Sequence, residues 1–246
     1  MSTVTDATSG TQFAASIGEL NEIRSRDPGR IKRLLVGRRK RELLGPDGKL
    51  MIIACDHPAR GALSAAGKAN AMASRTDLLD RLVTALTRPG VDGVLATADI
   101  AEDLLMLGVL EEKLVIASMN RGGLQGATFE MDDRNTGYDV SGTIEAGFEG
   151  AKMLLRIDLE DPATVATLER CGEAVSALNR AELIAMVEPF MPPLLEAIAG
   201  LGRDVQGIIE HDLYPCAPDL PLPIAQRTKS YLSSCSGAAI EFRRQP

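Results

Sequence analysis

The regular alternation of strand-like and helix-like segments is the feature that most constrains the fold of this 246-residue chain. Apolar, strand-like segments are expected at residues 49–55, 92–96, 113–119, 152–157 and 183–190. Helices are expected between and after them, at residues 76–86, 100–107, 143–150, 162–179 and 194–201. This alternation predicts βαβ units and a parallel sheet. Five consecutive units of similar spacing favour a (β/α)8 TIM barrel, of the α/β class, over a doubly wound sheet.

The C-terminal part of the chain departs from this pattern. Three further units would need roughly 100 residues at the spacing of the first five, and only 46 remain after Gly200. Four prolines between residues 215 and 223 disfavour helices and central strands there. We therefore expect an incomplete barrel of about five to six units. The chain is expected to comprise a disordered tail over 1–28, barrel units over 29–203 and an atypical segment over 204–246. A frameshift or truncation would produce such a C-terminal segment. The alternative is a compact ending that completes the barrel by another route.

The composition disfavours several classes of function. The four cysteines are widely spaced and form no Cys-x-x-Cys pair, which argues against a disulfide framework or zinc site and fits a cytoplasmic location. Two histidines leave little for a metal site, and no cofactor is expected. A net charge of −7 disfavours nucleic-acid partners. No apolar run approaches the roughly 18 residues that span a membrane, so no membrane partner is expected either.

One basic segment, at residues 30–41, is an exception to the acidic balance. Its intervening leucines and valine give it an amphipathic pattern. A basic amphipathic helix can bind phosphate polymers or a membrane surface. The favoured interpretation is a solvated helix that covers one end of a domain.

Two ionisable residues stand inside apolar strand segments. Lys152 begins the run that ends near Asp158, and Glu188 closes the run that begins at Ile184. A lysine is costly to bury unless it is paired or functional, and a desolvated amine can attack a carbonyl carbon. The two segments therefore predict a shared polar site. The alternative is a structural Lys–Glu ion pair in the core.

Polar residues also follow the expected strands, where a barrel carries its chemistry. Asp56 and His57 follow the first strand, Asn120 and Arg121 follow the third, and Glu188 lies near the end of the fifth. Asp99 follows the second strand. Lys152 is expected lower, inside the barrel.

Three motifs carry a resemblance to a known family. They are Ala54-Cys55-Asp56-His57-Pro58-Ala59-Arg60-Gly61-Ala62-Leu63, Gly150-Ala151-Lys152-Met153-Leu154-Leu155 and Val187-Glu188-Pro189. Over roughly residues 30–203 the chain resembles class I aldolases of the deoxyribose-phosphate and tagatose-bisphosphate aldolase superfamily. It is most similar to an actinobacterial branch of deoxyribose-phosphate aldolase-like (β/α)8 proteins.

The resemblance implies roles for individual residues. Asp56 would orient substrate or relay a proton, Lys152 would be an auxiliary active-site lysine, and Glu188 would assist proton transfer. His57, Arg60, Asn120 and Arg121 would contact the substrate.

The resemblance also implies a reaction, the cleavage of a phosphorylated keto sugar or deoxy-keto sugar acid through a Schiff base. Examples are the phosphorylated deoxy-keto acid of inositol breakdown and deoxyribose 5-phosphate. A homo-oligomer is expected. In relatives the Schiff-base lysine lies on strand 6, but the expected sixth strand here, 205–209, has none. Lys229 is the only lysine after Lys152.

Two other functions stay open at the level of sequence. A metal-dependent isomerase or lyase barrel could use Asp56 and His57 as ligand and base. Alternatively, the chain could be a catalytically inactive truncated barrel or an interaction protein, because missing units would expose the edges of the first and fifth strands.

Overall fold

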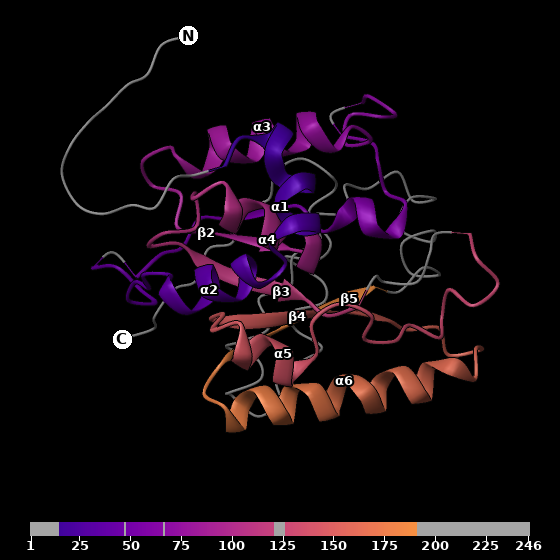
Figure 1. Cartoon of the computed structure of the whole chain (residues 1–246). Coiled ribbons are helices and arrows are strands. Elements are labelled where there is room, and N and C mark those ends of the chain that lie inside the picture. Colours follow the sequence, from indigo (N-terminus) through magenta and orange to yellow (C-terminus); the bar gives the residue numbers. More distant parts are fainter. Residues whose placement is uncertain (1–14, 47, 66, 121–125, 191–246) are drawn as a thin grey trace, which may run out of the picture.

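The structure is a computed structural model that describes residues 15–46, 48–65, 67–120 and 126–190 (Figure 1). Its strands are β1 (Ile52–Ala54), β2 (Gly93–Ala96), β3 (Leu114–Ser118), β4 (Gly150–Arg156) and β5 (Ile184–Phe190). Its α-helices are α1 (Leu20–Arg26), α2 (Gly29–Gly37), α3 (Arg75–Leu86), α4 (Ala98–Met106), α5 (Val140–Glu145) and α6 (Ala163–Arg180). Two short 3-10 helices are η1 (Ile17–Glu19) and η2 (His57–Arg60). None of the helices in these ranges is long and apolar enough to cross a membrane.

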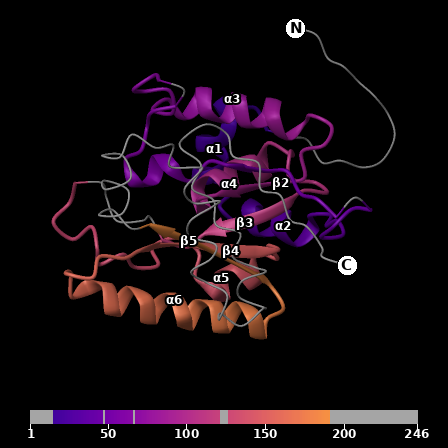
Figure 2. The same cartoon turned by 180° about the vertical axis from the view of Figure 1, so that it is seen from behind.

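All five described strands are parallel and lie in the order β1-β2-β3-β4-β5. A doubly wound sheet would reverse its strand order at a switch point, whereas a barrel keeps the order of the chain. The described strands therefore form a curled half-barrel, as Figures 1 and 2 show. This confirms the α/β class and a partial barrel.

The two faces of the sheet carry different apolar layers. Ile52, Leu95 and Ile116 belong to a small cluster on the concave face, which also includes Leu50 and Leu114. Alternate residues of the same strands, such as Val94 and Val115, join a much larger cluster with the helices. Side chains alternate between the faces of a strand, so each buried strand contributes to both layers. Figures 1 and 2 show α3 and α6 at opposite ends of the curled sheet.

Two glycines allow neighbouring strands to approach on the concave face. A Cβ added at Gly93 would lie 2.3 Å from the carbonyl oxygen of Leu114, and one at Gly150 would lie 2.5 Å from Ile184 Cβ. Neither approach is possible for a side chain. The two glycines therefore let β2 pair with β3, and β4 with β5, at their amino ends.

The basic segment closes the amino ends of the strands. Arg38 is buried and donates to the carbonyl oxygens of Lys113 and Gly147, at 2.7 and 2.8 Å, and to Glu149 at 2.6 Å. Arg41 forms an ion pair with Asp92. These partners precede β2, β3 and β4, so the positive charges are used within the fold. This arrangement agrees with the interpretation that the segment covers one end of the domain.

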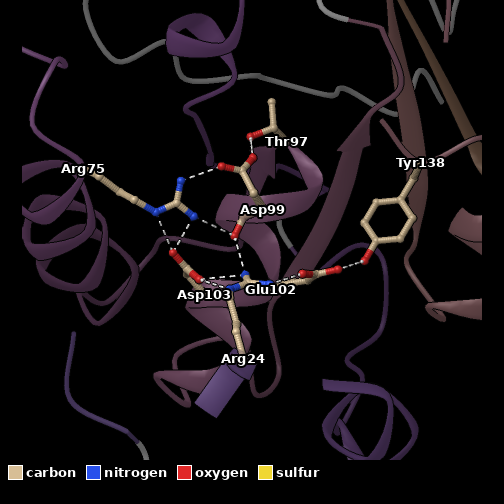
Figure 3. A network of polar contacts seen from close by, with 7 residues as sticks. All are labelled: Arg24, Arg75, Thr97, Asp99, Glu102, Asp103 and Tyr138. Carbon is tan, nitrogen blue, oxygen red and sulfur yellow. Dashed lines mark hydrogen bonds and ion pairs between the residues drawn. The ribbon is translucent and has the colours of Figure 1, made fainter. Parts of the chain in front are cut away.

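The N-terminal helix α1 is tied to the barrel helices by a polar network (Figure 3). Arg24 of α1 and Arg75 of α3 both pair with the buried carboxylate of Asp103 on α4, at 2.7 and 2.5 Å. Arg24 also pairs with Glu102, which accepts a hydrogen bond from the Tyr138 hydroxyl. Residues 17–26 are thus helical, within the range 1–28 for which the sequence suggested disorder, because charged side chains anchor them.

The predicted elements match the described ones closely, with shifted ends. The largest shift is in α5, which spans Val140–Glu145 and not 143–150, and β1 begins at Ile52 and not at Lys49. The expected helix at 194–201, the expected sixth strand at 205–209 and the atypical segment over 204–246 lie outside the described residues.

Candidate active site

A buried lysine between two carboxylates forms the centre of the candidate site. Lys152 on β4 is 3% exposed, and its Nζ donates to Asp56 Oδ2 at 2.8 Å. The same Nζ forms an ion pair with Glu188 Oε2 from β5. Asp56 is 4% exposed and also accepts a hydrogen bond of 3.2 Å from the Ser118 hydroxyl. The structure thus brings the three residues with predicted catalytic roles together.

The curl of the sheet makes this meeting possible. Asp56 follows β1, whereas Lys152 lies on β4, and two strands separate β1 from β4 in the sheet. Side chains from β1 and β4 could not meet across a flat sheet, because neighbouring strands lie about 4.8 Å apart. Glu188 reaches Lys152 from the adjacent strand, where it pairs in register with Leu154. All three side chains therefore point to the concave face.

Positive neighbours decide the charge of Asp56. Burial by itself would raise the pKa of this carboxyl group, because a carboxylate loses hydration there. The charges of Lys152, Arg60 and His57 and the hydrogen bond from Lys152 outweigh burial, so the pKa of Asp56 lies well below its usual range. Asp56 is therefore a permanent anion at neutral pH, suited to orient a cation or a hydroxyl group.

His57 and Arg60 lie beside Asp56 on η2, and Gly61 ends this turn with φ of 85°. Arg60 Nη1 and His57 Nδ1 each lie 3.7 Å from an Asp56 oxygen, which is longer than a hydrogen bond. The Nδ1 atom of His57 is buried without a hydrogen-bond partner among the described residues. Burial lowers the pKa of His57, although Asp56 opposes this, so the ring tends to be neutral. Both side chains keep donors or acceptors for a ligand.

Asn120 is at the predicted edge of the site, but its side chain is engaged within the protein. It is buried and bonds to the backbone of Leu154 and to Asp133. These bonds leave its carboxamide little capacity for a substrate. The predicted substrate contact Arg121, and the glycines that follow it, lie outside the described residues.

Arg156 is a site residue that the sequence analysis missed. It lies four residues beyond Lys152 on β4, is buried, and pairs with Glu130 at 2.5 Å. Its guanidinium lies 5.0 Å from the centre of the Phe190 ring. Burial lowers the pKa of Arg156, while Glu130 and Asp133 oppose the shift. The period of two on a strand, which places residues 152 and 156 on one face, was the signal that could have revealed it.

Other predicted polar residues serve different roles. Asp99 belongs to the network of Figure 3, where it pairs with Arg75 at 2.5 Å, and not to the lysine site. Burial raises the pKa of the Cys55 thiol well above its usual range, which makes Cys55 a poor nucleophile. Within the described ranges, no group of three His, Cys, Asp or Glu side chains is arranged to hold a metal ion.

Comparisons with known proteins give a family and a structural neighbour. Residues 48–209 match the family model described as Cgl0159-like. The crystal structure of Cgl0159 from Corynebacterium glutamicum (Brevibacterium flavum) is similar, with a TM-score of 0.68 and 53% sequence identity. The match covers 71% of this chain and 59% of that one, so this chain spans less than two thirds of that protein. No curated protein matches the chain. Neither description names an activity, and the similarity to class I aldolases stays a prediction.

Proposed function

The chain belongs to the Cgl0159-like family, and we propose that it is a lyase of the class I aldolase type, which acts on a phosphorylated keto sugar or deoxy-keto sugar acid. The observation that carries the proposal is the contact of Lys152 with both Asp56 and Glu188 on the concave face. An amine beside two proton acceptors has the groups that imine chemistry needs.

In the proposed reaction, the amine of Lys152 attacks the substrate carbonyl. The ammonium group must first give a proton to a carboxylate, and Asp56 is the poorer acceptor because its positive neighbours hold its pKa well below the usual range, which leaves this role to Glu188. Addition of the amine and loss of water give a protonated imine, which accepts the electron pair of the breaking carbon–carbon bond. A carboxylate removes the proton of the β-hydroxyl group as the aldehyde leaves. The remaining enamine regains a proton at carbon, and water then hydrolyses the imine to release the ketone and the free amine.

Arg60 is the proposed contact for an anionic part of the substrate. Arg60 is only 9% exposed. Its Nη1 nevertheless lies 3.7 Å from Oδ2 of its ion-pair partner Asp56, beyond hydrogen-bond distance. A guanidinium group has five N–H donors in a planar fork, which suits a phosphate or carboxylate. A substrate anion would therefore find unused donors next to the reactive amine.

Borohydride trapping tests the proposal. The full chain is incubated with dihydroxyacetone phosphate, glyceraldehyde 3-phosphate or deoxyribose 5-phosphate, reduced, and analysed by intact mass and peptide mapping. We expect a covalent adduct on Lys152 that is lost in Lys152→Met and kept in the exposed-lysine control Lys68→Met. We also expect the wild-type chain to cleave its substrate slowly. In Lys152→Met the rate of cleavage should be lower than in the wild type by a factor of about 100 or more. An adduct on Lys229 that survives Lys152→Met would overturn the assignment to Lys152.

A second candidate function is that of an interaction protein, and one feature favours it. A groove of about 460 Å³ lies between β1 and α3, and its lining comprises the apolar residues Met51, Ile53, Ala85 and Val91 and the polar residues Asp80, Arg81, Thr84 and Arg88. Among the described strands, β1 pairs only with β2. An unpaired strand edge beside an apolar groove can bind another chain. If trapping fails with every carbonyl compound while the chain associates through this edge, this candidate replaces the lyase.

A further inference from the structure

The pairing of β3 with β4 ends at Lys152, in the candidate site. Their ladder ends with Ser118 opposite Lys152, and the Met119 amide still donates to the Lys152 carbonyl oxygen at 2.9 Å. β4 nevertheless continues to Arg156, which pairs with Phe190 of β5. The next residue of β4 that faces β3 with its backbone is Leu154. Without a partner, its N–H and C=O groups would be buried and unsatisfied, which is rare in folded proteins.

The side chain of Asn120 replaces the missing strand at this position. Its Oδ1 accepts the Leu154 amide proton at 2.8 Å, and its Nδ2 donates to the Leu154 carbonyl oxygen at 2.7 Å. A carboxamide carries a donor and an acceptor side by side, as a peptide group does. Asn120 is 6% exposed, so water does not compete freely for these bonds.

The same carboxamide ties a loop to β4. Nδ2 also donates to Asp133 Oδ2 at 2.9 Å, and the backbone of Asn120 forms a β-bridge with Asn135. Glu130 of this loop pairs with Arg156, two residues beyond Leu154. Asn120 therefore joins the end of β3, the middle of β4 and the loop at one point.

We infer that Asn120 is a positioning residue that fixes where Lys152 lies along the direction of β4, and therefore its position between Asp56 and Glu188. Lys152 pairs with Ser118 of β3 and with Met186 of β5, and it lies two residues before Leu154, where the Asn120 side chain replaces β3. A shift of β4 at Leu154 would also displace Glu188, which pairs in register with Leu154. A functional role for this positioning rests on the proposed lysine chemistry, whereas the positioning itself does not.

The test uses two variants and a control. Asn120→Leu keeps the approximate shape of the side chain and removes the carboxamide, whereas Asn120→Ser is too short to reach Leu154 and avoids overpacking. Asn70→Ser changes an exposed asparagine away from the site. In each full-length protein, Lys152 labelling by an amine-selective reagent is measured relative to the exposed Lys68 in the same sample. Hydrogen exchange is measured for peptides that contain Leu154.

We expect both Asn120 variants to change the Lys152 to Lys68 labelling ratio at least threefold and to speed exchange around Leu154 at least tenfold. Asn70→Ser should change neither. Faster exchange with an unchanged labelling ratio in a folded variant would show that Asn120 supports β4 without positioning Lys152, which overturns the inference. If the labelling ratio changes but the wild-type chain traps no carbonyl compound, the positioning stands and the proposed lyase function fails.

Discussion

β4 and β1 belong to the same sheet but are braced very differently. β4 has seven residues, all buried, and pairs with both β3 and β5. β1 has three residues and, among the described strands, pairs only with β2, while an apolar groove lies along its outer face. The lysine of the candidate site is on the braced strand. Asp56, which follows β1, is held by hydrogen bonds from Ser118 and from the charged amine of Lys152.

Burial on the concave face holds the site end of β1, which among the described strands pairs with β2 alone. Ile52 has no exposed surface and lies with Leu95 and Ile116 on that face, while its neighbour Met51 is 37% exposed and lines the groove. The core residue at the start of β1 thus directly follows a surface residue.

The largest expected effect separates Ile52 of β1 from Met51, which directly precedes the strand. Ile52→Ala should lower the free energy of unfolding by about 2–5 kcal/mol, because it leaves a cavity in a closed layer. Met51→Ala should lower it by less than about 1 kcal/mol, because solvent already reaches the side chain. Urea unfolding followed by circular dichroism measures both. Equal losses in the free energy of unfolding would mean that Met51 is packed as tightly in the groove as Ile52 is on the concave face, which would contradict the comparison.

A second prediction tests the tight packing of β4 against β5. Gly150→Ala should cost about 1–3 kcal/mol, because the new Cβ would lie 2.5 Å from Ile184 Cβ and 2.6 Å from its carbonyl oxygen. Gly172→Ala on α6 is the matched control, since a Cβ there meets nothing within 4 Å and alanine is the better helix former. The control should gain up to about 1 kcal/mol. Thermal unfolding of the two variants should therefore shift in opposite directions.

The sequence was sufficient for the strand order and for the core of the site. Apolar runs separated by helical patterns located all five described strands, because burial on both faces of a parallel sheet leaves a clear signal. Lys152 and Glu188 were identifiable because an ionisable residue is conspicuous inside such a run. Asp56 was identifiable because it directly follows a strand, where barrels place their chemistry.

The sequence was insufficient where a side chain acts through partners that are remote along the chain. Nothing in the local sequence distinguishes Asp103 from an exposed acid, yet it is buried between Arg24 and Arg75. Asn120 reads as a substrate contact, yet its carboxamide continues the β3–β4 ladder. Residue spacing predicts which element a side chain lies on, but contacts across the sheet depend on its curl, which no local pattern specifies.

A third prediction concerns the acid response of Asp56. Its pKa is lower in the folded protein than in the unfolded chain, so the folded state binds this proton less readily. The stability from this carboxylate is present above about pH 4 and is lost as pH falls toward the folded value. Asp56→Asn should therefore reduce the slope of unfolding free energy against pH below pH 4, by up to about 1.4 kcal/mol per pH unit.

Urea midpoints between pH 2.5 and 6 measure this slope. Glu173→Gln, which removes an exposed carboxylate on α6, is the control and should keep the wild-type slope. If Asp56→Asn also keeps it, the surrounding cations do not stabilise Asp56 as the geometry indicates.

The smallest expected change in stability tests whether β1 and the groove beside it form a contact surface. Thr84→Lys places a charge in the groove at an exposed position of α3, where lysine is a good helix former. The free energy of unfolding should stay within about 0.5 kcal/mol of wild type. Self-association, measured by light scattering over a concentration series, should decrease, because a charge beside an open strand edge opposes pairing with another chain. Ser25→Lys on α1 adds the same charge on an exposed helix that does not line the groove, so association that falls equally in both variants would reflect net charge and not the edge of β1.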